Sequence, residues 1–83
     1  MDIIEAHKRC IHNWSELTVS AKCGCFYCLE IYSPNEVAEW TDDDDTAICP
    51  RCGIDAVIGD ASGFSVTTEF MGRMHRRWFE NEV

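Results

Sequence analysis

The sequence predicts a small α+β domain that a bound metal ion holds together. Two cysteine pairs, Cys25-Phe-Tyr-Cys28 and Cys49-Pro-Arg-Cys52, are separated by 20 residues, a spacing typical of a structural metal site. Apolar residues recur at helical intervals near both ends of the chain, and short apolar runs that suit β-hairpins lie between them. With 83 residues, the chain has room for one domain and a small core, which a metal ion can stabilise.

The expected order is an N-terminal helix, a metal core and a C-terminal helix, all within one domain over residues 1–83. The first helix is predicted over residues 2–19, because an apolar stripe there follows the helical period. We expect the stripe to pack against the rest of the domain. Its members are Ile3, Ile4, His7, Cys10, Ile11, Trp14 and Leu17.

The metal core is predicted over residues 23–59. A Cys-x2-Cys turn lets two thiolates reach one ion, and a second such turn completes a tetrahedral shell of four sulfurs. One structural Zn²⁺ per chain is therefore expected. Its predicted ligands are Cys25, Cys28, Cys49 and Cys52.

Two further cysteines leave alternatives open. Only one residue separates Cys23 from Cys25, so Cys23 is expected to be a spare thiol or a packed side chain. Cys10, with the neighbouring His12, becomes a candidate ligand if more than one ion is bound. Six cysteines can also pair as disulfides, but the N-terminal residues lack the order of a signal peptide, which favours reduced thiolates.

Between the cysteine pairs, the sequence predicts a strand, a short helix and an acidic loop. Residues 29–32 alternate as a short strand does. Ser33 and Glu36 form a capping-box pattern around Pro34, so a short central helix is expected over residues 34–40. The aspartates that follow lack the ligand pattern of an EF-hand loop, so we expect a solvated loop tip, with a partner-binding patch as the alternative. They are Asp42, Asp43, Asp44 and Asp45.

After the second cysteine pair, residues 54–58 suit a strand that pairs with residues 29–32 or with the segment entering Cys49. The C-terminal helix is predicted over residues 67–81, with Thr67 as its N-cap and an aromatic stripe toward the core. The opposite face carries the positive cluster Arg73, Arg76 and Arg77. This face can contact an acidic partner or RNA, or neutralise the aspartate loop of the same or a neighbouring chain.

The chain is acidic, with a net charge of −8, and residues 33–62 hold eight acidic residues against one arginine. Such a field repels phosphate backbones and argues against non-specific nucleic-acid binding. No apolar run approaches the roughly 20 residues of a membrane span. A cytoplasmic protein without a membrane segment is therefore expected.

The two cysteine turns with their flanking strands resemble a zinc ribbon. The sequence also resembles, over residues 22–79, a family of small uncharacterised bacterial cytoplasmic proteins. The resemblance implies a four-cysteine site and a cytosolic location, and it carries no activity. The segments that bear it are Cys23-Gly-Cys-Phe-Tyr-Cys28, Glu39-Trp40, Cys49-Pro-Arg-Cys-Gly-Ile-Asp55 with Val57-Ile58-Gly59, and Met74-His75 with Trp78-Phe79.

The favoured function is a non-enzymatic zinc-binding interaction module, because four sulfurs close the shell and no histidine lies in a recognisable catalytic motif. Its expected partner is a protein, such as a basic or nucleic-acid-handling factor. A rubredoxin-like electron carrier is one alternative, although Leu29 stands where such a turn commonly has glycine. A zinc ribbon that binds nucleic acid through the C-terminal arginines is the other.

Overall fold

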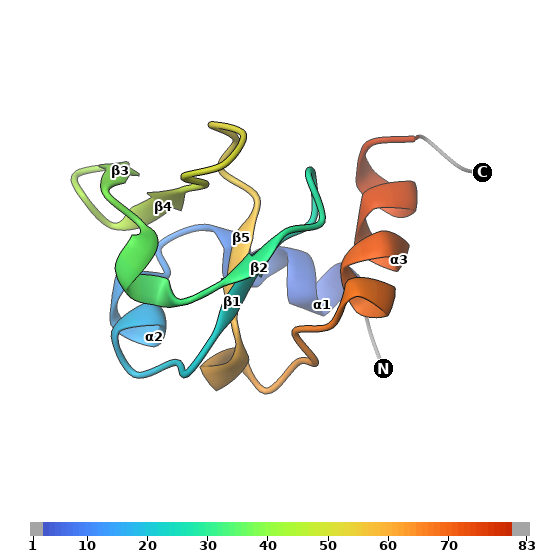
Figure 1. Cartoon of the computed structure of the whole chain (residues 1–83), viewed down its shortest axis with the longest axis horizontal. Coiled ribbons are helices and arrows are strands. Elements are labelled where there is room, and N and C mark those ends of the chain that lie inside the picture. The colour runs from blue at the N-terminus through green and yellow to red at the C-terminus, as the bar shows by residue number, and fades with distance from the viewer. Residues whose placement is uncertain (1–2, 81–83) are drawn as a thin grey trace.

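The computed structural model describes residues 3–80 and shows a three-stranded antiparallel sheet, a separate β-hairpin and helices around them (Figure 1). The strand order in the sheet is β2-β1-β5, and β3 pairs with β4 in the hairpin. The structure thus agrees with the predicted class, a small α+β domain with antiparallel hairpins and a cysteine cluster. The elements, with η for 3₁₀ helices, are α1 (Ile3–His7), η1 (Lys8–Cys10), α2 (Trp14–Thr18), β1 (Cys23–Cys25), β2 (Ile31–Tyr32), η2 (Pro34–Glu36), β3 (Glu39–Thr41), β4 (Thr46–Ile48), β5 (Val57–Gly59), η3 (Asp60–Ser62) and α3 (Thr68–Trp78).

The central strand of the sheet is β1, which begins at Cys23 and ends at Cys25. It pairs antiparallel with β2, where Cys23 lies opposite Tyr32, and with β5, where Cys25 lies opposite Val57. All three residues of β1 are buried, as are all three of β5. The sequence predicts that the strand after the second cysteine turn pairs with residues 29–32 or with the segment entering Cys49. Both alternatives are wrong, because β1 lies between β2 and β5, and β4, which leads into Cys49, pairs with β3.

The N-terminal helix predicted over residues 2–19 is interrupted, and residue 2 lies outside the described residues. After η1 the backbone becomes extended at Ile11, and His12 has a positive φ of 49°. The buried side chain of Asn13 holds this break. Its Nδ2 donates to the carbonyl oxygens of Arg9 and Val57 at 3.0 and 2.7 Å. The break depends on a partner distant in sequence, Val57. The helical spacing of apolar residues between 2 and 19 gives no sign of that partner.

The interruption changes which residues of the predicted stripe are buried. Cys10 and Leu17 lie in the core, at 5 % and 2 % exposure, whereas Ile4, Ile11 and Trp14 are about half exposed, at 51 %, 48 % and 48 %. Two short helical segments with a bend between them cannot keep one continuous apolar face. Packing of the whole stripe is therefore a wrong prediction, although Ile3, Cys10 and Leu17 do pack against the core.

The central helix predicted over residues 34–40 is also wrong beyond its first turn. Only η2 is helical, and the backbone is extended from Val37 into β3. The expected capping box does not form: the Ser33 hydroxyl donates to the Asn35 side-chain oxygen at 2.7 Å, and Glu36 pairs with Arg51 at 2.9 Å. Pairing of β3 with β4 gives this segment the backbone partners that a longer helix would have supplied.

The C-terminal helix begins as predicted. Thr67 is extended, and its Oγ1 accepts a hydrogen bond from the Phe70 N–H at 3.1 Å. The helix ends at Trp78, three residues before the expected limit, and residue 81 lies outside the described residues. Of the predicted stripe, Phe70, Met71 and Met74 are buried and Trp78 is partly buried against the core. Phe79, its last member, is 41 % exposed, so packing of that residue is a wrong prediction.

The core lies between the central sheet and these helices. Its largest fully buried side chains include Leu17, Phe26, Ile58, Met71 and Met74. Within residues 3–80, no helix combines the length and the apolar character that crossing a bilayer requires.

Candidate metal centre

Two turns of the same kind carry the four cysteines that the sequence predicts as ligands. The first turn starts at Cys25, the last residue of β1, and the second at Cys49, just after β4. The Leu29 N–H donates to the Cys25 carbonyl at 2.8 Å, and the Gly53 N–H donates to the Cys49 carbonyl at 3.0 Å. Each turn is therefore closed by a backbone hydrogen bond between residues four positions apart.

The residue that leaves each turn has a left-handed backbone conformation. Gly53 has a φ of 82°, which glycine adopts freely, and Leu29 has a φ of 69°. Leu29 is partly buried and packs against the core, which offsets the strain of a positive φ at a leucine. The missing glycine therefore does not prevent the first turn from matching the second.

The four cysteine sulfurs converge on one point. The Sγ atoms of all four residues lie within 4.8 Å of one another. The distance from Cys25 to Cys52 is 3.6 Å, and that from Cys28 to Cys49 is 3.7 Å. In a tetrahedral site with Zn–S bonds of about 2.3 Å, sulfurs lie about 3.8 Å apart. The cluster thus has the size that one tetrahedrally coordinated ion needs, and all six cysteines are free thiols.

Backbone amides within the turns point at two of these sulfurs. The Tyr27 N–H donates to Cys25 Sγ at 3.3 Å, and the Arg51 N–H donates to Cys49 Sγ at 3.3 Å. Hydrogen bonds of this kind stabilise a thiolate. Both turns therefore support the charged form of cysteine that binds a metal ion.

Cys49 has a further donor, the hydroxyl of Tyr32, which lies 3.0 Å from its sulfur. Burial raises the pKa of the Cys49 thiol, but hydrogen bonds from Tyr32, Arg51 and Cys52 outweigh it, and the pKa falls to about 7. Burial, followed by the contact with Cys49, raises the pKa of Tyr32 far above its ordinary value. The tyrosine thus keeps its proton and donates to the sulfur.

Two other thiols of the cluster differ from Cys49. Burial is the main cause that raises the pKa of both Cys25 and Cys52. A cation entering the cluster must displace protons from these two sulfurs, so ion binding is coupled to proton release.

Tyr32 is a functional candidate that the sequence did not reveal. Its position in a short apolar alternation predicts a strand residue, which it is, and nothing local marks its hydroxyl as a donor to Cys49. The contact arises because β2 pairs with β1, and β1 ends at Cys25, whose sulfur lies 3.6 Å from that of Cys52 in the second turn. Aromatic residues on the strand after a cysteine turn would be the place to look for such donors.

Cys10 and Cys23 lie outside the four-sulfur cluster. Both are buried, and burial raises their pKa values to about 11 and about 12. Cys23 is a packed side chain, one of the two roles expected for it. His12, considered as a ligand beside Cys10, instead places its Nδ1 3.1 Å from a carboxylate oxygen of Asp45.

The two candidate partner-binding groups lie at opposite ends of the molecule (Figure 1). Asp42 to Asp45 form the turn between β3 and β4, whereas Arg73, Arg76 and Arg77 are exposed on α3. The aspartate loop therefore does not neutralise the arginines of its own chain. Arg77 instead lies over the ring of Trp78, with its Cζ 4.4 Å from the ring centroid.

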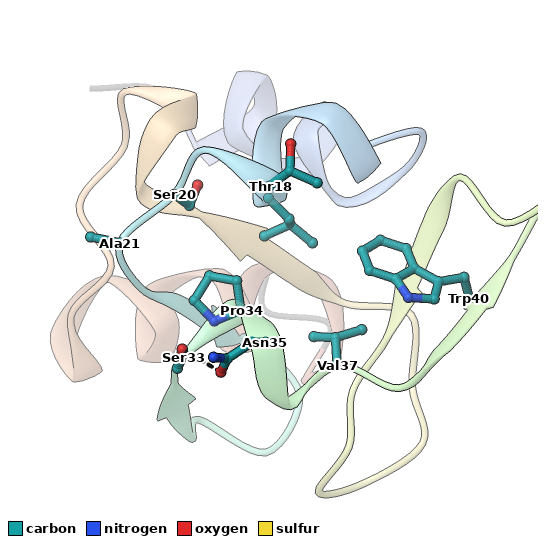
Figure 2. Close-up of a pocket in the computed structure, with 9 residues that line it drawn as sticks. Thr18, Ser20, Ala21, Ser33, Pro34, Asn35, Val37 and Trp40 are labelled. Atoms are coloured by element: carbon teal, nitrogen blue, oxygen red, sulfur yellow. Dashed lines mark hydrogen bonds between the residues drawn. The ribbon is translucent and has the colours of Figure 1, made fainter.

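A cleft of about 400 Å³ opens beside the acidic hairpin. Figure 2 shows Pro34, Val37 and Trp40 on one side, and Thr18 and Ser20 from α2 and the loop after it on the other. Trp40 belongs to β3, the strand that leads into the aspartate turn. The cleft, which has both polar and apolar lining residues, thus reaches the strand that leads into the aspartate turn.

Searches against protein-family models, curated proteins and solved structures found no match to this chain. The resemblance to small bacterial cytoplasmic proteins stays a prediction from sequence.

Proposed function

We propose that this protein is a non-enzymatic, zinc-binding interaction module of the zinc-ribbon type. The observation that carries the proposal is the convergence of four cysteine sulfurs within 4.8 Å. Four thiolates form a soft donor set that suits Zn²⁺, and they complete its tetrahedral shell. A complete shell leaves no position for water or substrate, so the ion stabilises the fold and performs no chemistry.

A stabilising role for zinc follows from the position of the cluster. Cys25 and Cys28 belong to the central sheet and its first turn, whereas Cys49 and Cys52 follow the separate β3–β4 hairpin. An ion bound by all four joins these two parts of a domain whose core is small. The thiolates must stay reduced for this purpose, which agrees with the cytoplasmic location that the sequence predicts.

The acidic hairpin and the cleft beside it support a basic peptide segment as the partner. Asp42, Asp43 and Asp44 are exposed, and Glu39 at the start of β3 is exposed as well. Trp40 offers an apolar surface within the cleft. A segment that carries lysines or arginines around one large apolar side chain is complementary to both features.

Iron remains the alternative ion. The positive φ of Leu29 matches that of Gly53, so the first turn has the shape that a rubredoxin-like site needs despite its leucine. Iron would convert the proposed structural site into an electron carrier.

The metal assignment is tested with two cysteine variants and one control. Cys25→Ser and Cys52→Ser each remove a ligand, so we expect loss of stoichiometric zinc and of cooperative thermal unfolding. Cys10→Ser changes a buried cysteine outside the cluster and should keep one zinc per chain with a modest loss of stability. Zinc content by elemental analysis and unfolding by circular dichroism provide the readouts. The ligand assignment is wrong if all three variants lose zinc equally.

The partner assignment is tested with a short fluorescent peptide of lysines around one leucine. Fluorescence anisotropy should show binding that weakens when Asp42–Asp45 are changed to asparagine or when Trp40→Ala is introduced. Changing Arg73, Arg76 and Arg77 to glutamine provides the control and should leave peptide binding intact. Single-stranded DNA is the competing probe, and DNA binding that depends on those arginines would favour the nucleic-acid alternative.

A further inference from the structure

One side chain outside the four cysteines contacts a ligand sulfur. The Tyr32 hydroxyl lies 3.0 Å from Cys49 Sγ, closer than the backbone amides that approach the sulfurs at 3.3 Å. Tyr32 is 5 % exposed and Cys49 is 2 % exposed, so water has little access to this hydrogen bond. Across residues 3–80, Tyr32 is the only non-cysteine side chain that donates a hydrogen bond to one of the four sulfurs.

The structure holds the tyrosine ring in place from two sides. Its strand, β2, is paired with β1, and Tyr32 lies opposite Cys23. The guanidinium carbon of Arg51 lies 5.2 Å from the ring centroid. Arg51 also forms exposed ion pairs with Glu30 at 3.2 Å and Glu36 at 2.9 Å. The hydroxyl thus has a defined direction toward the sulfur.

We infer that Tyr32 is a positioning residue of the metal site and makes Cys49 the weakest electron donor of the four ligands. A hydrogen bond to a thiolate withdraws electron density from sulfur, which weakens its donation to an ion and its reactivity toward electrophiles. This inference rests on the proposed zinc function and adds to it an asymmetry within the shell. Cys28 and Cys52 are partly exposed, so electrophiles reach the site first at these sulfurs.

Cobalt(II) in place of zinc gives a direct optical test. Its sulfur-to-metal charge-transfer absorption moves to lower energy when a sulfur ligand donates more strongly. Tyr32→Phe removes the hydroxyl and keeps the ring, so we expect the band of the stoichiometric cobalt complex to shift to longer wavelength. Tyr27→Phe is the matched control, because Tyr27 is the other of the two tyrosines and is exposed. A band that is identical in wild type and Tyr32→Phe would overturn the inference.

Alkylation of the zinc-loaded protein by iodoacetamide gives a second readout. The thiolate supplies the electron pair for a new sulfur–carbon bond, and iodide leaves; peptide mass spectrometry then identifies the modified cysteine. Only molecules with a single alkylated cysteine are counted, so that earlier reaction at Cys28 or Cys52 has not opened the site. Among these, Tyr32→Phe should raise the alkylation rate of Cys49 about fivefold relative to that of Cys25, which is also buried and lacks a hydroxyl donor. An unchanged ratio of the two rates contradicts the inference.

If Tyr32→Phe fails to fold, a fluorinated tyrosine at position 32 provides a second way to change the hydrogen bond to Cys49. Incorporated into a Tyr27→Phe background, it occupies position 32 alone, and its more acidic phenol is a stronger donor. The charge-transfer band should then move to higher energy, and a band that does not move counts against the inference. A wild-type protein that forms no tetrahedral cobalt–thiolate complex would instead contradict the proposed zinc function itself.

Discussion

Asp42, Asp43 and Asp44 all have left-handed backbone conformations, with φ values of 55°, 60° and 66°. Most residues with a Cβ pay about 1–2 kcal/mol for this conformation, and aspartate and asparagine tolerate it best. The turn is closed by the Asp45 N–H, which donates to the Thr41 carbonyl at 3.0 Å. The aspartate run is thus suited to the shape of the turn between β3 and β4.

Substitutions at Asp43 test whether the aspartates are suited to the left-handed backbone of the turn. Asp43 is chosen because no hydrogen bond or ion pair joins its side chain to the rest of the described chain. Asp43→Gly should raise the free energy of unfolding, because glycine adopts a positive φ without strain. Asp43→Val should lower it by about 1–2 kcal/mol, because a β-branched side chain is disfavoured there. Urea unfolding of the metal-loaded protein measures both. Equal stability of the two variants would show that the backbone of the turn is not strained.

The buried thiol of Cys10 should make the stability of the fold depend on pH in the alkaline range. Burial, followed by the charge of Asp55, raises the pKa of its thiol from 9.0 to about 11. Between these pH values the unfolded chain loses this proton while the folded protein keeps it, so stability falls as pH rises. In Cys10→Ala that contribution is absent, and the urea midpoint should fall less between about pH 8 and about pH 11. If the urea midpoints of the variant and the wild type fell equally with pH, the Cys10 thiol would not contribute to this pH dependence.

Among the secondary-structure elements, short sequence patterns correctly predicted those that contacts between nearby residues determine. The cap at Thr67 and the apolar stripe of α3 lie within a few residues of each other, and both are present. The N-terminal helix and the central helix were predicted from similar local patterns. Their interruptions depend on Asn13, which bonds to Val57 across 44 positions, and on the pairing of β3 with β4. Such partners have no signature in a short window of sequence.

Replacing Gly59 and Gly72 by alanine should change the free energy of unfolding in opposite directions. A Cβ at Gly59 in β5 would meet Ser20 Oγ and lie 2.7 Å from Leu17 Cδ2, whereas the nearest atom to a Cβ at Gly72 in α3 is an Arg76 nitrogen at 3.9 Å. Gly59→Ala should therefore lower the free energy of unfolding by about 1–3 kcal/mol through overpacking. Gly72→Ala should raise it by about 0.5–1 kcal/mol, because alanine favours the helix.

Thermal or urea unfolding of both variants tests this pair under identical conditions. The contact at Gly59 would be shown to be unimportant if its alanine variant matched the wild type. A loss of stability in Gly72→Ala would mean that α3 packs at this position more closely than the structure shows.

At the scale of the whole molecule, the site was more predictable than the surface around it. The spacing of the cysteines was enough to predict which four sulfurs converge, because each Cys-x2-Cys turn is a local structure. The donor Tyr32 and the cleft beside Trp40 were not predictable, since both need the packing of segments far apart in the chain. The separation of acidic and basic groups to opposite ends also depends on the complete fold (Figure 1).

We propose that one zinc ion, held by four thiolates, maintains this fold. The proposal is tested by native mass spectrometry of tag-free protein, with elemental analysis of the bound metal. We expect one zinc per chain, and removal of the zinc by a chelator should broaden the charge-state distribution as the chain unfolds. Bound iron would point to electron transfer instead. A folded protein without metal would contradict the claim.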